Sequence, residues 1–296
     1  MFVVQEFFAR SQLCGEGSRI QESAHGQEPI AAEIGGGIIL RRILRALGII
    51  VGILLAANTM FWAYRQIHGF FVSDALSNLP PVMLWAWERP EDLSFVDCRE
   101  TGVAFLAKTL TIDRGGIIVR PRLQPLAVPD ACPMVAVVRI EARKGVRLRG
   151  YAGEVADEIA AVADRGKLAA VQVDFDAVVS QREFYRRVLK LVRERLPDSV
   201  RLSITALASW CIYDDWIRGL PVDEAVPMLF QMGTGEDAVR GYLARGGDFR
   251  VAACRFSYGL ATDERPPRLP AARRTYFFSA RPWMPAAVAR VLGGEE

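Results

Sequence analysis

Short apolar runs alternate with longer helical or turn-rich stretches from Pro80 to the end of the chain. This alternation is typical of βα units arranged around a parallel sheet. The runs predicted to be strands are Val82–Glu88, Val103–Leu110, Val135–Glu141, Ala170–Asp176, Arg201–Ala208, Val226–Met232, Arg250–Phe256 and Arg274–Arg281. Eight such strands in about 215 residues predict an α/β fold, a closed (β/α)8 TIM-like barrel.

The stretches between the runs support this interpretation with one exception. Residues Tyr151–Ala163 repeat apolar positions at helical spacing, which predicts a helix packed on the outside of the sheet. The exception is Asp113–Pro133, where Gly115, Gly116 and four prolines predict a long loop or a strand excursion in the second unit.

An uncharged run of about the length needed to cross a bilayer, Ala46–Tyr64, precedes the predicted barrel. Arg41, Arg42 and Arg45 stand close before it, and Arg65 stands almost alone after it. The positive-inside rule then places the N-terminus in the cytoplasm and exports the rest of the chain. We predict a single N-terminal transmembrane helix, with a cleaved signal peptide and a buried core helix as the alternatives.

These features divide the chain into four parts. Residues 1–40 are predicted to be a disordered cytoplasmic extension, or the product of a start codon assigned too far upstream. Residues 41–66 form the predicted signal anchor and residues 67–79 a linker. Residues 80–296 form the exported barrel domain, which places the protein in the inner membrane with its C-terminal domain in the periplasm.

The cysteines bear on the compartment. Cys14 falls on the cytoplasmic side of the predicted anchor, while Cys98, Cys132, Cys211 and Cys254 fall in the predicted exported part. An exported domain lies in an oxidising compartment, where four cysteines allow three pairings. The alternative for Cys254 is a small buried side chain without a bridge. The sequence leaves the pairing open.

Composition excludes several classes of function. The net charge is +3, and no block of basic residues is interleaved with aromatics, so the sequence predicts no nucleic-acid partner. His25 and His68, the only histidines, precede the predicted barrel, which excludes a Ser-His-Asp triad and a His-ligated zinc site inside it. No Gly-x-Gly-x-x-Gly follows a strand, and no calcium-loop spacing occurs, so we predict neither a cofactor nor a metal.

The segment Val171–Ala177 carries the main candidates for chemistry. Its alternation places Val171, Val173 and Phe175 on one face and puts two carboxylates, Asp174 and Asp176, on the other. Catalytic acids of barrel enzymes come from the ends of strands, so Asp174 and Asp176 are the predicted catalytic residues.

Polar and aromatic residues gather where the other predicted strands end. Those predicted to bind substrate are Trp87, Glu88, Glu141, Trp210, Asp215, Gln231, Tyr258, Arg281 and Trp283. Indole rings stack on the apolar faces of pyranose rings, while carboxylates and amides bind hydroxyl groups. The set predicts a carbohydrate site, with Trp87, Trp210 and Trp283 as the stacking platform.

Each candidate has a structural alternative. Asp174 and Asp176 can cap the next helix or lie on a solvated strand face, and Asp215 can cap a helix. Glu141 can simply pair with Arg139 inside the barrel. The prediction of a site therefore depends on the convergence of many residues and on no single one.

Four stretches, Val171–Ala177, Leu202–Cys211, Asp223–Gly233 and Arg281–Trp283, carry a family resemblance. In them the chain resembles an uncharacterised bacterial family, a domain of unknown function related to TIM-barrel glycosidases. The resemblance covers most of Pro80–Leu292 and implies a fold without an established activity.

A more distant resemblance is to chitinase-type glycoside hydrolases. Their fourth strand ends in alternating aspartates, which Asp174 and Asp176 match, followed two residues on by an acid glutamate. That position holds Val178 here, which cannot donate a proton. Either another carboxyl supplies the acid, or the barrel binds glycans without cutting them.

The sequence thus predicts a membrane-anchored, exported, glycoside-hydrolase-like barrel whose partners are a carbohydrate or envelope glycan and the membrane. In this hypothesis Asp176 is the general acid or its immediate partner, and Asp174 raises the pKa of Asp176 by like-charge repulsion. A non-catalytic glycan-binding or cell-envelope assembly module on the same fold is the alternative.

Overall fold

The computed structural model describes residues 74–214, 216–270 and 272–293, together with positions 44, 47, 48 and 52, which are helical. The predicted extension 1–40 and, apart from those helical positions, the predicted anchor Ala46–Tyr64 lie outside the described residues. Within the described residues, no helix has both the length and the apolar character needed to cross a bilayer. The chain divides into two compact units, Met1–Ile67 and His68–Glu296, and the second holds the fold described below.

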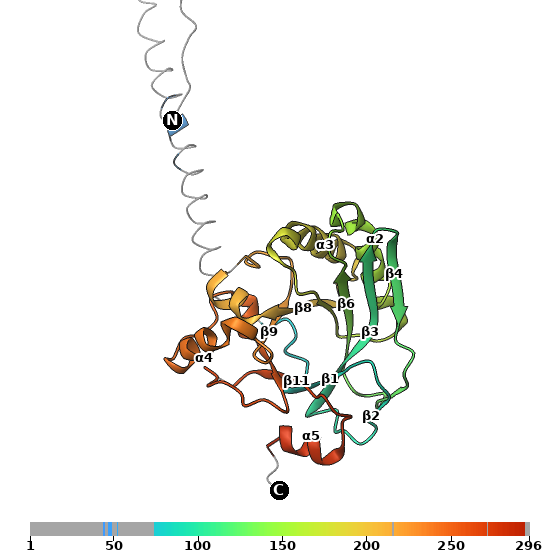
Figure 1. Cartoon of the computed structure of the whole chain (residues 1–296). Coiled ribbons are helices and arrows are strands. Elements are labelled where there is room, and N and C mark those ends of the chain that lie inside the picture. Colours follow the sequence, from blue (N-terminus) through green and yellow to red (C-terminus); the bar gives the residue numbers. More distant parts are fainter. Residues whose placement is uncertain are drawn as a thin grey trace, which may run out of the picture. The chain divides into compact units, whose positions relative to one another are not determined.

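The second unit is built on eight parallel strands that close into a barrel (Figure 1). The strands are β1 (Val82–Ala86), β3 (Thr101–Asp113), β6 (Met134–Ala142), β7 (Ala170–Asp174), β8 (Arg201–Leu207), β9 (Glu224–Met228), β10 (Ser257–Ala261) and β11 (Arg274–Phe278). They pair in chain order, and β1 pairs with both β3 and β11, which closes the sheet. The predicted TIM-like barrel is confirmed.

Helices cover only part of the barrel. The α-helices of the described residues are α2 (Ala152–Ala160), α3 (Arg182–Arg195), α4 (Glu236–Ala244) and α5 (Pro285–Val291). Short helical turns are η1 (Leu148–Tyr151), η2 (Ala163–Arg165), η3 (Val179–Gln181), η4 (Trp210–Asp214), η5 (Gly233–Gly235) and η6 (Ala252–Arg255). The predicted helix Tyr151–Ala163 corresponds to the end of η1, to α2 and to the start of η2.

The stretch Asp113–Pro133, predicted to be either a long loop or a strand excursion, forms a strand excursion. After β3 the chain turns into β4 (Gly116–Pro121), which pairs antiparallel with β3. It then forms β5 (Leu126–Ala127), which pairs with β2 (Glu91–Asp92) outside the barrel. The prolines explain the absence of a helix here, because proline removes the N–H that a helix interior needs.

The prediction of a strand at Arg250–Phe256 is wrong. The strand β10 begins at Ser257, and the preceding apolar run forms the helical turn η6. In this run Val251 and Cys254 are buried while Ala252 and Ala253 are half-buried. A three-residue spacing of the buried positions fits a 3-10 turn, which a short apolar run does not distinguish from a strand.

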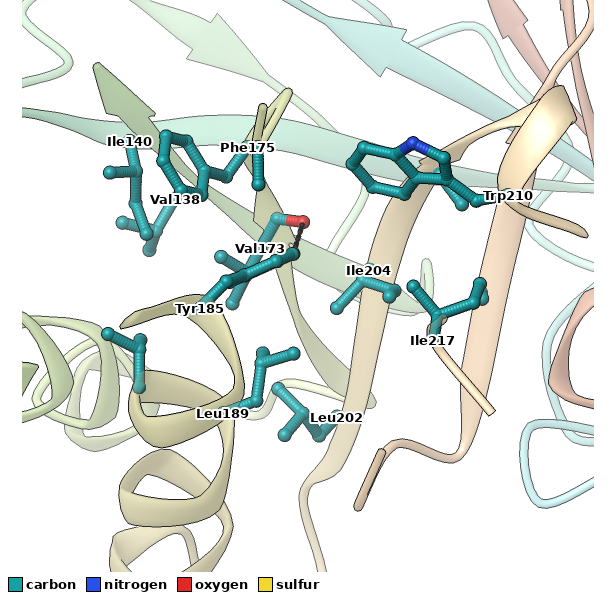
Figure 2. Packing of buried hydrophobic residues seen from close by; sticks show 14 of the residues in the cluster. Val138, Ile140, Val173, Phe175, Tyr185, Leu189, Leu202, Ile204, Trp210 and Ile217 are labelled. Carbon is teal, nitrogen blue, oxygen red and sulfur yellow. Dashed lines mark hydrogen bonds between the residues drawn. The ribbon is translucent and has the colours of Figure 1, made fainter. Parts of the chain in front are cut away.

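The larger core lies between the barrel and its helices. Figure 2 shows Val173 and Phe175 from the β7 segment packed against Tyr185 and Leu189 of α3. The Phe175 and Tyr185 rings meet edge to face with centroids 5.3 Å apart. The alternation of Val171–Ala177 is therefore confirmed: its apolar face is buried against α3, and its polar face points into the barrel.

The barrel interior combines an apolar core with a buried polar network. Leu76 and Leu79, in the predicted linker, pack into the interior cluster with Met83 and Tyr276. At the N-terminal end of the strands, Arg274 donates to Glu224 over 2.9 Å, and Glu224 is completely buried. The folded unit therefore begins before Pro80.

This network continues upward through the barrel. Ser203 and Tyr276 donate their hydroxyl protons to Glu224, each over 2.9 Å. Burial and the charge of Glu224 raise the pKa of Tyr276 well above its usual value, so this phenol stays a donor. Gln172 donates to Ser203 and accepts from the indole N–H of Trp85 over 2.9 Å. A chain of hydrogen bonds thus links the bottom of the barrel to Trp85.

Both cysteine pairs of the barrel unit are joined. Cys98 bonds to Cys132, which links the connection before β3 to the connection before β6. Cys211, in η4, bonds to Cys254, in η6. The structure thereby selects one of the three pairings that the sequence left open, and the alternative of an unbridged Cys254 is wrong.

Candidate functional site

Asp174 lies where β7 leaves the barrel at its C-terminal end. Strand alternation points its side chain inward, in line with Gln172 two residues earlier. The Thr205 hydroxyl of the neighbouring strand donates to Asp174 Oδ1 over 2.7 Å, and Arg139 Nε lies 3.9 Å from Oδ2. The Asp174 side chain is only 15% exposed, so the protein holds this carboxyl in place and shields it from water.

The pKa values of both predicted catalytic acids are raised. For Asp174 the main cause is burial, which the Thr205 hydrogen bond partly opposes, and the charge of Asp176 raises the pKa further. For Asp176 burial raises the pKa and the charge of Arg139 opposes the rise. Burial, and not repulsion from Asp174, is therefore the cause at Asp176; the predicted like-charge effect acts on Asp174 instead.

Both acids open into a small cavity at the mouth of the barrel. The cavity has a volume of about 180 Å3 and is lined by Trp85, Trp87, Arg139, Asp174, Asp176, Thr205, Met228, Phe230, Gln231 and Phe278. The structure thus brings together four of the predicted site residues: Asp174, Asp176, Trp87 and Gln231. A pocket with a few polar groups of raised pKa among aromatic walls is the usual form of a ligand site.

Aromatic rings form the wall opposite the acids. Phe230 and Phe278 stack with centroids 5.6 Å apart, and Trp87 meets Phe278 edge to face at 6.5 Å. Trp85 lies beneath them, 6.2 Å from Phe230, where its indole N–H is bonded to Gln172. These four rings, named here the aromatic wall, offer an apolar surface beside the carboxylates.

A second hollow of about 220 Å3 adjoins the first on the β6 side and shares Arg139, Asp174 and Asp176 with it. Glu141 lines it and accepts from Thr111 and from Arg120, over 3.1 and 3.3 Å. Arg139 Nε lies 3.5 Å from Glu141 Oε1, so these two residues form the ion pair that was the structural alternative to a substrate-binding role of Glu141. Arg139 is therefore shared between Glu141 and Asp174.

Gln231 has a strained backbone. Among the described residues it is the one non-glycine residue with a positive φ, at +48°. The carboxylate of Glu264 accepts from the Gln231 backbone N–H over 3.2 and 3.3 Å, which fixes this conformation. Such strain is concentrated at functional sites, and here it occurs at the rim of the mouth cavity.

The remaining predicted residues lie elsewhere. Glu88 is exposed at the end of β1, 3.5 Å from the Thr109 hydroxyl, and lines neither hollow. Arg281 borders a separate hollow between the β10–β11 ends and α5. Asp215 lies outside the described residues.

Three predicted aromatic residues are part of the core and do not reach the mouth. Trp210 is buried in the larger core between the barrel and its helices (Figure 2). Its ring meets Trp216 edge to face with centroids 5.0 Å apart. Tyr258 is fully buried in the same cluster. Trp283 is buried against the β1–β3 side, with its indole N–H donated to the Trp85 carbonyl over 3.0 Å. The predicted platform of three tryptophans is therefore reduced to Trp87.

The sequence reasoning missed Thr205, Phe230 and Phe278. Thr205 lies two residues after Ser203 and Phe278 two residues after Tyr276, and both earlier residues point inward. Because side chains alternate along a strand, Thr205 and Phe278 are predicted to point inward as well. Phe230 follows the end of β9, where parity no longer applies.

The described residues contain no group of three or more His, Cys, Asp or Glu side chains arranged to hold a metal ion. At the mouth, Arg139 and Thr205 already occupy part of the coordination space of Asp174.

No protein-family model matches the chain, and no curated protein matches it. A solved structure, the chitinase domain of the spore coat protein CotE from Clostridium difficile, aligns at 13% sequence identity with a TM-score of 0.36. The alignment covers 72% of this chain and 61% of that one, so the chain spans about three fifths of that domain's length. The barrel assignment here depends on the strand pairing itself.

Proposed function

We propose that the barrel binds a carbohydrate in its C-terminal mouth and hydrolyses a glycosidic bond there. The observation that carries the proposal is the arrangement in the cavity: two carboxyls of raised pKa, Asp174 and Asp176, face the aromatic wall. Glycoside hydrolysis requires a protonated carboxyl and a second carboxylate beside the sugar. Stacking of the sugar requires apolar rings next to these acids.

In this mechanism Asp176 is the general acid. It is the more exposed of the two, so a bound glycosidic oxygen can approach it, and its raised pKa keeps the proton available. Asp174, held by Thr205, is the second carboxylate, and its charge stabilises the oxocarbenium-like transition state. The charge of Asp176 raises the pKa of Asp174, and the charge of Arg139 lowers the pKa of both acids, so Arg139 limits the effect of burial on them.

The cavity sets the size of the bound group. Drug-sized ligands occupy pockets of about 300 to 1,000 Å3, and the mouth cavity of about 180 Å3 is smaller. It suits a single sugar ring, with the rest of the chain in the adjoining hollows. Trp87 and Phe278 then form the stacking surface.

One observation favours the second candidate, a glycan-binding module without catalysis. Val178 is 57% exposed just beyond Asp176, at the position where the chitinase-type resemblance expects a glutamate. A barrel in which Asp174 and Asp176 only accept hydrogen bonds from sugar hydroxyls needs no such acid.

The test compares Asp176→Asn and Asp174→Asn with a control, Asp198→Asn. Asp198 is exposed in the connection between α3 and β8, at the other end of the barrel. Turnover is measured on a panel of aryl glycosides and chromogenic oligosaccharides, and affinity on a glycan array. We expect the Asp176 variant to lose at least about a hundredfold in kcat, the usual contribution of a general acid, and the control to keep its activity.

The outcomes separate the candidates. Loss of turnover with retained glycan affinity supports hydrolysis. A wild-type protein that binds glycans through Trp87 but turns over none of the panel supports the binding module. Variants at Asp174 and Asp176 that keep full turnover and affinity would rule out the mouth as the site.

We also propose that the barrel is exported, with the run Ala46–Tyr64 as its anchor. The two disulfides, Cys98–Cys132 and Cys211–Cys254, support this because such bonds persist in oxidising compartments. A reporter that is active only after export, fused behind Leu292, should be active. Activity of a cytoplasm-only reporter at the same place would refute the topology.

A further inference from the structure

A strongly basic hollow adjoins the mouth of the barrel. It has a volume of about 770 Å3 and lies between the loop after β6 and the start of α3. Its basic side chains are Arg143, Lys144, Arg147, Arg149 and Arg187. A shallower hollow of about 390 Å3 shares Arg143 and Lys144 with it and adds Arg114 from the β3–β4 turn. We name the two together the basic groove.

The cations of the basic groove lack partners. Among the described residues, none of these six side chains makes a hydrogen bond or an ion pair, and all six are exposed. The cations nearer the mouth differ: Arg120 pairs with Glu141, Arg139 lies beside Asp174, and Arg182 pairs with Asp214. Like charges that are gathered without counter-charges repel one another, so a bound anion stabilises the arrangement.

Few acids lie close enough to compensate. Asp113 borders the shallower hollow, and its carboxylate accepts from the Gly115 backbone N–H over 2.7 Å. Glu183 borders the larger hollow from the first turn of α3. Two acids against six cations leave the groove with a positive charge of four, larger than the +3 of the whole chain.

The basic groove adjoins the candidate active site at one residue. Gln181 borders both the larger basic hollow and the hollow that holds Asp174 and Asp176. Its side-chain oxygen accepts from the Val178 backbone N–H over 3.1 Å, which fixes it at the boundary. A chain bound in the groove therefore has to pass Gln181 to reach the acids.

We propose that the basic groove binds the anionic part of a carbohydrate chain, a polymer carrying carboxylate, sulfate or phosphate groups, whose end enters the mouth. This deepens the proposed function and rests on it. Val146, which is half-buried, lines both hollows between the cations, so the groove offers an apolar contact beside its charge. An anionic membrane surface suits a flat or protruding patch, whereas these cations surround a hollow.

The experiment uses the full chain and three probes: an oligogalacturonate of about ten units, a neutral malto-oligosaccharide of equal length, and phosphatidylglycerol vesicles. Wild type is compared with Arg143→Glu/Lys144→Glu and with the control Lys167→Glu/Arg245→Glu, which reverses two exposed charges that line neither hollow of the groove. We expect wild type to bind the oligogalacturonate at least about tenfold more tightly than the neutral chain, and to lose this preference at high salt. The groove variant should lose the preference, and the control should keep it.

Other results decide against the proposal. Equal affinity of wild type for the anionic and neutral chains, equal loss in both charge variants, or binding to the vesicles alone would each overturn it. A groove variant that melts well below the control is replaced by Arg143→Gln/Lys144→Gln, which is judged by the same comparison. The proposed hydrolysis fails by a different result. The Asp176→Asn variant then keeps wild-type turnover, whether or not the wild-type protein prefers the anionic chain to the neutral one.

Discussion

Replacement of Arg274 by methionine tests the buried network at the bottom of the barrel. The guanidinium donates to Glu224 over 2.9 Å and to Asp74 over 2.7 Å, and its side chain is 5% exposed. Glu224 is completely buried, so Arg274→Met leaves its carboxylate without a counter-charge. Tyr276 and Ser203 still donate to one of its oxygens, but the other loses the partner that Arg274 supplied.

Removal of one partner of a buried ion pair costs about 3 to 5 kcal/mol. A domain has a free energy of unfolding of about 5 to 15 kcal/mol, so this is a large fraction of the total. At about 2 to 4 °C per kcal/mol for a domain of this size, the melting temperature should fall by roughly 10 °C. The double variant Arg274→Met/Glu224→Gln removes both charges and should recover at least about half of the loss.

The assay is calorimetric unfolding of the full chain under non-reducing conditions, for wild type, both single variants and the double variant. The exposed Arg245 provides the control, because Arg245→Met should change stability by less than about 0.5 kcal/mol. The reasoning is refuted if Arg274→Met costs no more than this control. It is also refuted if the two single losses add in the double variant, because coupled partners are not additive.

Asp174→Asn should raise the melting temperature at pH 7 and lose this advantage below about pH 4. The raised pKa of Asp174 makes the stability of the wild-type protein fall as the pH rises through that pKa, and asparagine removes this loss. Melting curves recorded over a series of pH values check the sign. Gly259→Ala places a Cβ 2.9 Å from the Trp85 ring, so it should cost about 1 to 3 kcal/mol and weaken glycan affinity by tilting this ring at the mouth; unchanged melting would refute the contact. Cys211→Ser/Cys254→Ser removes a bridge across 43 residues and should cost about 4 kcal/mol by chain entropy, measured by urea unfolding; a loss under about 1 kcal/mol would contradict this.

The fold was predictable where buried side chains follow the period of the element. Val171, Val173 and Phe175 alternate with inward-facing residues, and the strand containing them was located correctly. The prediction of a strand around Val251 and Cys254 failed because this run is too short for its periodicity to distinguish a strand from a helical turn.

The site was predictable only as far as the strands extend. Asp174 lies on a strand, and its inward direction follows from parity. Trp210 and Trp283 lie beyond strand ends, where loop conformation and the packing of α5 decide the direction of a side chain, and both are buried in the core. Phe278 ends β11 two residues after the inward-facing Tyr276, so its direction also follows from parity.

The chain of hydrogen bonds from Arg274 to Trp85 determines where a recombinant form of the domain has to begin. Its lower end is completed by residues that precede the first strand: Asp74 pairs with Arg274, and the Leu76 carbonyl accepts from the same guanidinium. A recombinant fragment cut at Val82, where the regular structure begins, would lack both and would leave the interior space of Leu76 and Leu79 empty. The same chain of hydrogen bonds reaches Trp85 in the mouth cavity, so a cut at one end of the barrel would change the shape of the candidate site at the other end.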